Sequence, residues 1–521
     1  MKKFILDCTL RDGGYCNNWN FGKENIKKII SGISDANIDI IECGFLTNKQ
    51  NYDENNSKFT EISQLNKFIG KNKKMYVLMS NYGEYNFDLL PHNQGVIDGI
   101  RLAFHKKDMF AALSDSKCII EKGYKLFLQA MVTMNYSDEE LLNLINLVNL
   151  IKPYAFYVVD SFGAMRKDNL IRFIYLLENN LDEKINIGYH AHNNLQMAYS
   201  NVETLLEMNL KHNLIIDSSI FGMGRGAGNL NTELIIDYFN NTGNKKYKLL
   251  PVLKIVDEVL NGFYERNYWG YSLANYISAI HNTHPNYASY LNKKKTLNLE
   301  DINNIIETID NSKINNYDEQ YIEKLYVNYL NKNVDVSLNL SKFKKAIEWK
   351  KILLIAPGKT VESEKETIID FKKNNDCITI SINFIYENLD TDYIFISNLR
   401  RFKEIDGDCW NRAILTSNIV TEHYFLKLQY KDLLNHTKYV KDNALLMLLY
   451  FLKSLNIKEV YLAGVDGYSP DYDDNYVDNK MNIYLDRIER LAINSGISEN
   501  LKYLNNDMKL INVTSIKNIK W

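Results

Sequence analysis

The chain has 521 residues, which is too long for one ordinary domain and predicts about two to four of them. Hydrophobic residues make up 45% of the chain and charged residues 24%, so a core can be buried and wholesale disorder is excluded. The 62 Lys and Arg residues balance 64 Asp and Glu residues at a net charge of -2, which argues against nucleic acid or an anionic membrane surface as a partner.

The cysteines and the apolar runs indicate the compartment. The 6 cysteines show no C-x-x-C spacing, so neither a zinc knuckle nor a disulfide framework is predicted, and a reducing environment is expected. Only a three-residue apolar run, 4–6, follows the N-terminal lysines, and no run approaches the roughly 20 residues of a membrane span. We therefore expect a cytoplasmic protein with no leader and no membrane span.

From residue 4 to about residue 239, short apolar segments alternate with amphipathic ones. Segments 139–151 and 168–177 carry apolar residues at three- and four-residue spacing, as crossover helices do. Eight β/α units in this length predict an α/β fold with a (β/α)8 TIM barrel, although periodicity alone leaves a doubly wound sheet open. The predicted strands are 4–6, 38–41, 75–78, 99–102, 125–128, 156–159, 185–188 and 215–216.

The remainder of the chain predicts two further parts. Helical periodicity at 250–261, 272–281, 299–309 and 317–330 indicates a helical subdomain over 249–345, appended to a barrel over 1–248. Apolar runs at 352–359, 377–382, 393–396 and 459–464, followed by glycine turns and helical segments, predict a C-terminal Rossmann-like α/β domain over 346–521.

Two histidines give the strongest chemical signal. His190 and His192 stand two residues apart at the end of the seventh predicted strand, so both imidazoles point to one face and can reach one ion. Such a pair with a carboxylate suits Mn²⁺, Co²⁺, Fe²⁺ or Zn²⁺. The alternative is a pair of hydrogen-bonded structural histidines, but the carboxyl end of a barrel strand is where barrel enzymes build their sites.

A second signal follows the first predicted strand. Arg11 and Asp12 are adjacent and precede two glycines, which places a planar cationic fork and an oxygen ligand at the same barrel mouth. Arg11 can then bind a carboxylate or enolate while Asp12 binds metal. The alternative is a surface turn in which the glycines provide backbone freedom.

Six segments at predicted strand ends carry residues suited to a common site. The segments are Leu10-Arg11-Asp12-Gly13-Gly14, Ile41-Glu42-Cys43-Gly44-Phe45, Ile100-Arg101-Leu102-Ala103-Phe104-His105, Asp160-Ser161-Phe162-Gly163-Ala164-Met165, His190-Ala191-His192-Asn193 and Gly222-Met223-Gly224-Arg225-Gly226-Ala227-Gly228-Asn229. Together they resemble the DRE-TIM metallolyases, the family that includes 4-hydroxy-2-oxovalerate aldolase and hydroxymethylglutaryl-CoA lyase. They occur in the family's order over about 230 residues, which favours the barrel.

The resemblance implies a role for each matching residue. Asp12, His190 and His192 match the ligands of a divalent metal, with Mn²⁺ or Mg²⁺ as first candidates and Co²⁺ or Zn²⁺ as alternatives. Arg11 matches the arginine that stabilises an enolate oxygen, and Glu42 matches the acid that orients it. Ser161 and Asn229 are the expected substrate-binding residues. The glycines of 222–229 have a rival interpretation as a phosphate loop, but they lack the spacing of a dinucleotide fingerprint.

The implied chemistry is formation or cleavage of a C–C bond next to a ketone, with a small 2-oxo acid and an aldehyde as substrates. The related aldolases have a histidine base where this chain has Tyr15, and a phenol is a poor base at pH 7. Three explanations are open. Tyr15 is activated as a base by a lowered pKa, or His284 or His105 is the base, or the aldehyde substrate differs from that of the related aldolases. The alternative for Tyr15 is simple packing at the barrel mouth.

Other activities and partners stay open. Claisen-type condensation of an acyl-CoA with a 2-oxo acid is the alternative reaction within the superfamily, and a homo-oligomer is expected. Aromatic residues and histidines at 268–272 and 281–287 either roof the barrel or belong to the core. In the aldolases a helical addition contacts a dehydrogenase, but this chain shows no dehydrogenase signature.

The C-terminal domain is similar, at 354–359, 381–384 and 460–468, to the nucleotide-sugar fold of sialyltransferase-like domains. The similarity implies a nucleotide sugar as a ligand and a role in polysaccharide biosynthesis, with the barrel supplying a small acid. Backbone amides at Gly358 could hold a phosphate. No histidine matches the transferase base, so a noncatalytic binding or dimerisation domain is the alternative.

Overall fold

The computed structural model describes residues 1–521 except 71–73, 243–245, 295, 332–338, 387, 406, 438, 472–474, 483–484 and 486. The chain forms two compact units. The first consists of Met1–Ser289 with Ile309–Tyr317, and the second of Tyr290–Thr308 with Asp318–Trp521. None of the described helices is long and apolar enough to cross a membrane.

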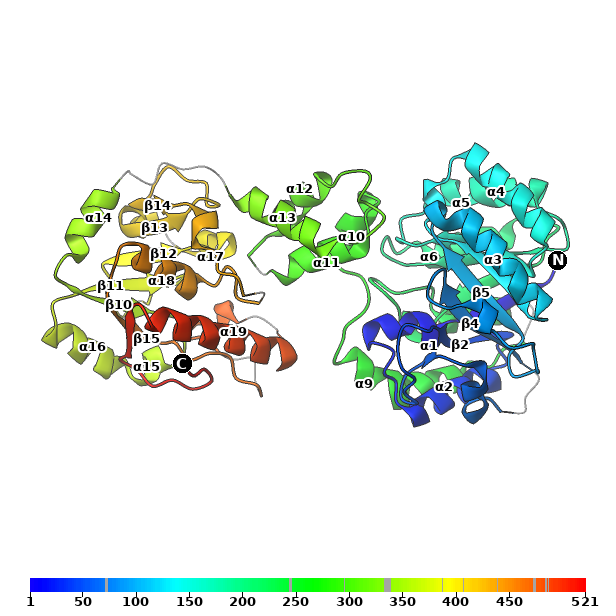
Figure 1. Cartoon of the computed structure of the whole chain (residues 1–521), viewed down its shortest axis with the longest axis horizontal. Helices are drawn as coiled ribbons and strands as arrows, with labels where there is room; N and C mark the ends of the chain where they lie inside the picture. The colour runs from blue at the N-terminus through cyan, green and yellow to red at the C-terminus, as the bar shows by residue number, and fades with distance from the viewer. Residues whose placement is uncertain are drawn as a thin grey trace. The chain divides into compact units, whose positions relative to one another are not determined.

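The first unit is a closed parallel barrel (Figure 1). Its two ends join because β1 pairs with both β2 and β9, for example Leu6 with Ile40 and with Asp217. The closure confirms the predicted (β/α)8 barrel over the doubly wound alternative. The barrel strands are β1 (Lys3–Asp7), β2 (Ile40–Leu46), β4 (Met75–Asn81), β5 (Gly99–Phe104), β6 (Lys125–Ala130), β7 (Ala155–Asp160), β8 (Asn186–Ala191) and β9 (Leu214–Ser218). The two-residue strand β3 (Lys58–Phe59) pairs with β2.

Helices cover the outside of the barrel, and their sequences explain where they begin. The helix α4 begins at a capping box, in which the Ser137 hydroxyl accepts from the Glu140 N–H and the Glu140 carboxylate accepts from the Ser137 N–H. Among the described residues, the helical turns that follow β2 and β4 are 3₁₀ turns at Ile62–Lys67 and Phe87–Leu89. The covering helices are α2 (Lys23–Asp35), α3 (Met109–Glu121), α4 (Asp138–Ile151), α5 (Lys167–Asn180), α6 (Ala198–Glu207) and α7 (Thr232–Asn241).

The alternation of side chains along each strand places the polar site inside the barrel. Ile40 and Ile215 point inward in an apolar layer, and two residues further along each strand the inward positions are the charged Glu42 and Asp217. The interior therefore changes from apolar to charged toward the carboxyl ends of the strands, where barrel enzymes hold their chemistry.

The segment expected to be helical, 249–345, forms helices joined by turns in its described part. It contains α8 (Leu250–Ile255), α9 (Asn261–Tyr264), α10 (Leu273–Ile280), α11 (Pro285–Lys293), α12 (Leu299–Glu307), α13 (Glu319–Leu330) and α14 (Leu340–Ile347). Trp269 and Tyr287 are buried, as a core role requires, whereas Tyr268 is exposed.

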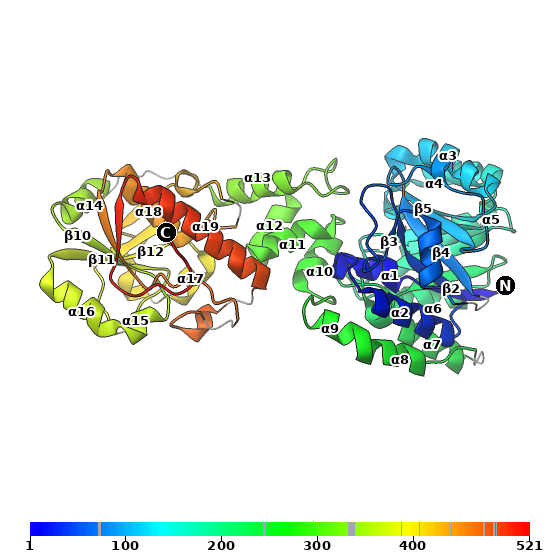
Figure 2. The same ribbon diagram turned by 60° about the horizontal axis from the view of Figure 1, so that its bottom comes forward.

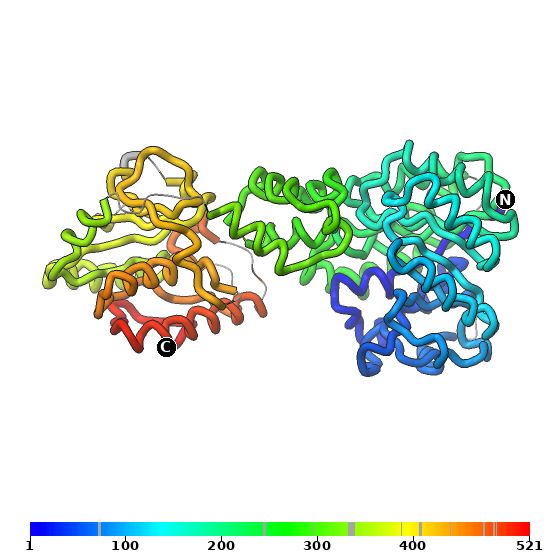
Figure 3. The backbone as a smooth tube through the Cα atoms, turned by 45° about the horizontal axis from the view of Figure 1, so that its top comes forward, coloured from blue at the N-terminus to red at the C-terminus, as the bar shows by residue number. Residues whose placement is uncertain are grey.

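The second unit contains a parallel sheet in the order β14-β13-β12-β11-β10-β15-β16, of which β10, β11 and β12 are labelled in Figure 2. The chain runs outward from β10 to β14 and then returns to the other side of β10, which is the doubly wound arrangement predicted for this domain. In Figure 3 the last helices, α18 (Ala444–Ser454) and α19 (Arg487–Asn505), lie side by side. The strands are β10 (Lys351–Ile355), β11 (Cys377–Ile382), β12 (Tyr393–Ile396), β13 (Ala413–Thr416), β14 (Leu426–Leu428), β15 (Glu459–Ala463) and β16 (Lys509–Asn512).

Candidate active site

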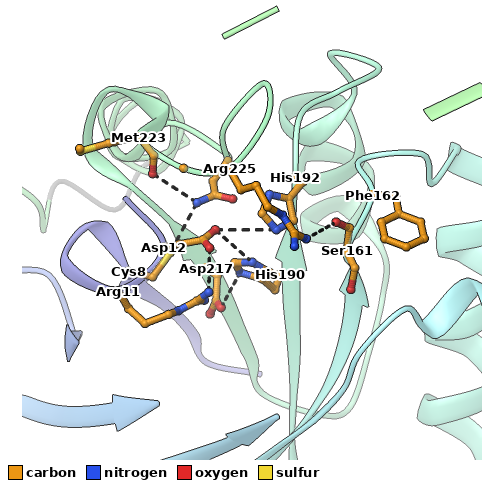
Figure 4. A network of polar contacts seen from close by, with 12 residues as sticks. Cys8, Arg11, Asp12, Ser161, Phe162, His190, His192, Asp217, Met223 and Arg225 are labelled. Atoms are coloured by element: carbon orange, nitrogen blue, oxygen red, sulfur yellow. Dashed lines mark hydrogen bonds and ion pairs between the residues drawn. The ribbon is translucent and has the colours of Figure 1, made fainter. Parts of the chain in front are cut away.

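The three predicted metal ligands lie together at the carboxyl end of the barrel (Figure 4). Asp12 follows β1 in the short helix α1 (Thr9–Asp12), His190 belongs to β8, and His192 comes directly after β8. The Oδ2 atom of Asp12 lies 3.6 Å from Nε2 of His190 and 3.7 Å from Nε2 of His192. All three side chains are buried. One carboxylate oxygen and two imidazole nitrogens lie within 4.8 Å of one another, close enough to share one metal ion.

The hydrogen-bond pattern of this cluster fits a bound cation. Asp217 accepts from Nδ1 of His190 at 2.9 Å, so the Nε2 atom of a neutral His190 carries a lone pair. Its separation from Asp12 is too long for a hydrogen bond. Oδ2 of Asp12 has no hydrogen-bond partner among the described residues although it is buried. Lone pairs that face one another in a buried site call for a positive charge between them.

The surroundings of the cluster keep Asp12 and His192 in their ligating forms, whereas His190 must lose a proton to bind metal: burial lowers its pKa, but the carboxylates of Asp12 and Asp217 raise that pKa above its usual value. Burial alone raises the pKa of Asp12, but Arg11 and the two histidines hold that pKa well below its usual range. Burial lowers the pKa of His192 to about 3, so this imidazole is neutral at pH 7. An ionised carboxylate and a neutral imidazole are the forms that bind a divalent metal.

Arg11 is held rigidly beside the cluster with one donor unused. Its Nε donates to Glu42 at 2.8 Å, as the predicted orienting role requires, and its Nη1 donates to Asp12 at 2.9 Å. The Nη2 atom is buried and has no hydrogen-bond partner within the part of the chain that the structure describes. A buried guanidinium N–H without an acceptor can stabilise an oxyanion that forms next to it.

Two residues that the sequence analysis did not assign complete this network. Arg101, on β5, is fully buried and forms ion pairs with Glu42 at 2.7 Å and with Asp217. Asp217 in turn orients His190. Arg101 was noted only as part of a resembling segment, and Asp217 directly follows the predicted strand 215–216. A charged residue at an inward position near the end of a barrel strand was the available signal.

A cavity of about 360 Å³ opens beside the cluster and is lined by Tyr15, His105, Ser161, Arg225 and His284, among others. The Ser161 hydroxyl accepts from the Val132 N–H at 2.8 Å, which leaves its own proton available to a ligand.

The substrate-binding candidate Asn229 lies at the barrel mouth but does not line this cavity. It pairs with His192 in a β-bridge. Its Oδ1 atom is buried without a hydrogen-bond partner among the described residues. The tight turn before it requires glycine, because Gly228 has φ +81° and a Cβ there would lie 1.9 Å from the Gly222 carbonyl oxygen.

The three groups considered as the base differ in protonation. Tyr15 is 41% exposed at the cavity mouth, yet the protein packed around it raises its pKa above the usual value, so the phenol stays protonated at pH 7. Burial lowers the pKa of His105 and lowers that of His284 to about 3. Both imidazoles are therefore neutral at pH 7, but the Asn286 N–H already donates to Nδ1 of His284 at 3.2 Å.

A parallel barrel with an Asp-His-His cluster, a neighbouring arginine and a cavity at the carboxyl ends of its strands is an arrangement typical of metal-dependent barrel enzymes. The HMGL-like family model matches residues 107–257. The 4-hydroxy-2-oxovalerate aldolase of Geobacillus genomosp. 3 is 27% identical over 244 residues, which cover 46% of this chain and 71% of that protein. The enzyme of the same name from Carboxydothermus hydrogenoformans is 27% identical over 260 residues, which cover 48% of this chain and 76% of that protein.

Among solved structures, the N-terminal domain of a candidate aldolase from Bacteroides vulgatus is 26% identical with a TM-score of 0.50, covering 55% of this chain and 96% of that one. A pyruvate carboxylase of Rhizobium etli, 13% identical with a TM-score of 0.50, covers 66% of this chain and 38% of that one and shares the fold alone. These similarities support a relationship of the N-terminal part of this chain to the DRE-TIM metallolyases and an enzyme of the lyase or aldolase class.

Proposed function

We propose that the barrel is a divalent-metal-dependent aldolase that forms or cleaves a C–C bond through the enolate of a short 2-oxo acid such as pyruvate. The observation that carries this proposal is the unused Nη2 donor of Arg11 beside the facing lone pairs of Asp12 and His190. The similarity to 4-hydroxy-2-oxovalerate aldolases supports it.

Each residue of the site has a separate role in the proposed reaction. A divalent cation held by Asp12, His190 and His192, with Mn²⁺ or Mg²⁺ as first candidates, would polarise the carboxylate and ketone oxygens of the 2-oxo acid. Arg11 donates to the ketone oxygen as negative charge develops on it, and the Ser161 hydroxyl donates to the carboxylate. In the condensing direction, C3 of the acid loses a proton and bonds to the aldehyde carbon, whose oxygen gains a proton; cleavage is the reverse.

We assign the base to His105. Tyr15 is protonated at pH 7 and acts as a hydrogen-bond donor to the aldehyde oxygen. The lone pair of His284 is already used by the Asn286 N–H. His105 is neutral at pH 7, lines the same cavity and makes no hydrogen bond with its side chain within the described residues, so its lone pair is free to accept a proton.

Proton exchange tests the proposal. The metal-loaded full chain should exchange the methyl protons of pyruvate in D₂O, measured by NMR, because the enolate forms before any bond to an aldehyde. The same chain dialysed against a chelator is the control. No exchange with pyruvate or with larger 2-oxo acids would contradict the proposal. Thiol release from acetyl-CoA in the presence of a 2-oxo acid would instead indicate Claisen-type condensation.

A second function is favoured by a cavity of about 280 Å³ in the C-terminal unit. It is lined by residues that follow β10, β11, β12 and β15, including Gly358, Asn383, Asn398 and Gly464. The strand order reverses between β10 and β15, and ligands of doubly wound sheets bind at such a point. We propose that this cavity binds a nucleotide sugar, in keeping with a cytoplasmic role in polysaccharide biosynthesis. Calorimetric titration of the full chain with UDP- and CMP-sugars tests it, and no heat with any of them would contradict it.

A further inference from the structure

The glycine-rich loop that follows β9 carries an arginine without a counter-charge. Arg225 lines the barrel cavity and donates from Nη2 to the Ser161 carbonyl oxygen at 3.0 Å (Figure 4). Its guanidinium also packs over the Tyr15 ring at 5.5 Å. Across the described part of the chain, no carboxylate lies within 4.0 Å of its guanidinium, including Glu84 and Asp108, which line the same cavity. Its Nε is buried without a hydrogen-bond partner among these residues. Arg225 is therefore a partly buried cation with unused donors.

His284 provides a second donor, because its surroundings assign the tautomer. The backbone N–H of Asn286 donates to Nδ1, so the proton of the neutral ring lies on Nε2. The Nε2 atom is 3.3 Å from Nη1 of Arg225. Two N–H donors thus face one another with no acceptor between them. An oxygen that accepts from both would remove this mismatch and supply the missing negative charge.

We propose that Arg225 and His284 form a subsite for a carboxylate or phosphate group on the carbonyl acceptor that reacts with the enolate. This inference rests on the proposed aldolase function and names its substrate class. A guanidinium fork binds two oxygens of such a group, whereas a neutral aldehyde would leave both donors without an acceptor on the substrate.

The position of the subsite favours the acceptor over the 2-oxo acid. The cavity extends from Ser161 past Arg225 to residues 315–317, all of which belong to the barrel unit. The metal ligands Asp12, His190 and His192 are not among its lining residues. An anion held by Arg225 and His284 therefore lies on the side of the site into which the second substrate extends.

The test compares acceptors that differ in charge. The metal-loaded full chain is supplied with pyruvate and one acceptor at a time. In the first pair of acceptors succinic semialdehyde is anionic and butanal is neutral; in the second pair glyceraldehyde 3-phosphate is anionic and glyceraldehyde is neutral. The 4-hydroxy-2-oxo acid formed is measured by NMR. At least one anionic acceptor should exceed its neutral counterpart in kcat/KM by about 100-fold, the loss expected when a buried charged donor is left unpaired. Equal values for both pairs would overturn the inference.

Variants separate the two possible sources of the anion. Arg225→Gln should reduce the preference for the anionic acceptor to within about threefold of unity, and His284→Asn, which keeps an acceptor for the Asn286 N–H, should reduce it by a smaller factor. The exposed Arg172→Gln is the matched control and should keep the full preference. The KM for pyruvate in the exchange reaction is measured in Arg225→Gln as well. If this KM rises by the factor by which the preference for the anionic acceptor falls, the anion belongs to the 2-oxo acid, and the acceptor assignment is overturned.

Failure of the inference and failure of the proposed function give different results. If wild-type protein exchanges the methyl protons of pyruvate but shows no preference for an anionic acceptor, only the subsite is wrong. If it exchanges no protons at all, the aldolase proposal itself is wrong, and there is no reaction in which the proposed subsite would bind an acceptor.

Discussion

Replacing Arg101 with methionine tests whether the buried charge network supports the barrel. Arg101 has no exposed surface and lies between Glu42 and Asp217. Methionine has a similar length and no charge, so the substitution removes the cation without opening a large cavity. Glu42 keeps its ion pair with Arg11, whereas the ion-pair partner that Asp217 keeps among the described residues is His190.

The expected cost follows from breaking a buried ion pair on one side only. Removing one partner of such a pair destabilises a protein by about 3–5 kcal/mol, because a buried charge is left uncompensated. At roughly 2–4 °C per kcal/mol for a unit of this size, the Tm of the barrel should fall by about 6–20 °C.

Differential scanning calorimetry of the full chain measures the change. Lys125→Met is the matched control, because Lys125 and Asp98 lie 3.9 Å apart and are 42% and 40% exposed. An exposed pair contributes about 0–1 kcal/mol, so the control should move the Tm little. If Arg101→Met also left the Tm within about 2 °C of the wild type, the network would not have the energetic role assigned to it.

Two further predictions concern other charges. Asp217→Asn should weaken metal binding by about 10–100-fold, measured by competition with a fluorescent chelator, because the group that orients His190 loses its charge; unchanged affinity would contradict this role. In the C-terminal unit, burial alone raises the pKa of Glu323, but Lys294 at 2.7 Å and Lys441 at 2.8 Å lower it to about 2. Because the folded pKa is depressed, this contribution of up to about 3 kcal/mol is present above about pH 4.5 and is lost as the pH falls toward 2. The difference in unfolding free energy between wild type and Glu323→Gln should shrink over that range, and a constant difference would contradict the assignment.

The sequence predicted the barrel well because its strands are short apolar runs at regular spacing. All eight predicted strands are present, and the predicted ligands Asp12, His190 and His192 meet in one cluster, since residues at the carboxyl ends of barrel strands converge. In the C-terminal sheet, β13, β14 and β16 were missed. They contain three or four residues each and, unlike the equally short but wholly apolar run of β12, include the polar residues Thr416, Lys427, Lys509 and Asn512.

The parts of the site that were not predicted depend on inward-facing positions that only the closed barrel reveals. Arg101 and Asp217 are far apart in the sequence. They form an ion pair because β5 and β9 direct both side chains into the barrel interior, toward one another. The donor mismatch between Arg225 and His284 depends equally on a loop and a helix end brought together by the fold.

Elemental analysis of two variants tests the central claim most directly. Arg11→Lys keeps the positive charge but loses the planar fork, so after dialysis it should retain stoichiometric metal while turnover falls by about 10²–10³-fold. His190→Ala removes one of the three ligands and should retain substoichiometric metal and no activity, with circular dichroism unchanged. Full metal occupancy in His190→Ala would contradict the assignment of Asp12, His190 and His192 as the metal site.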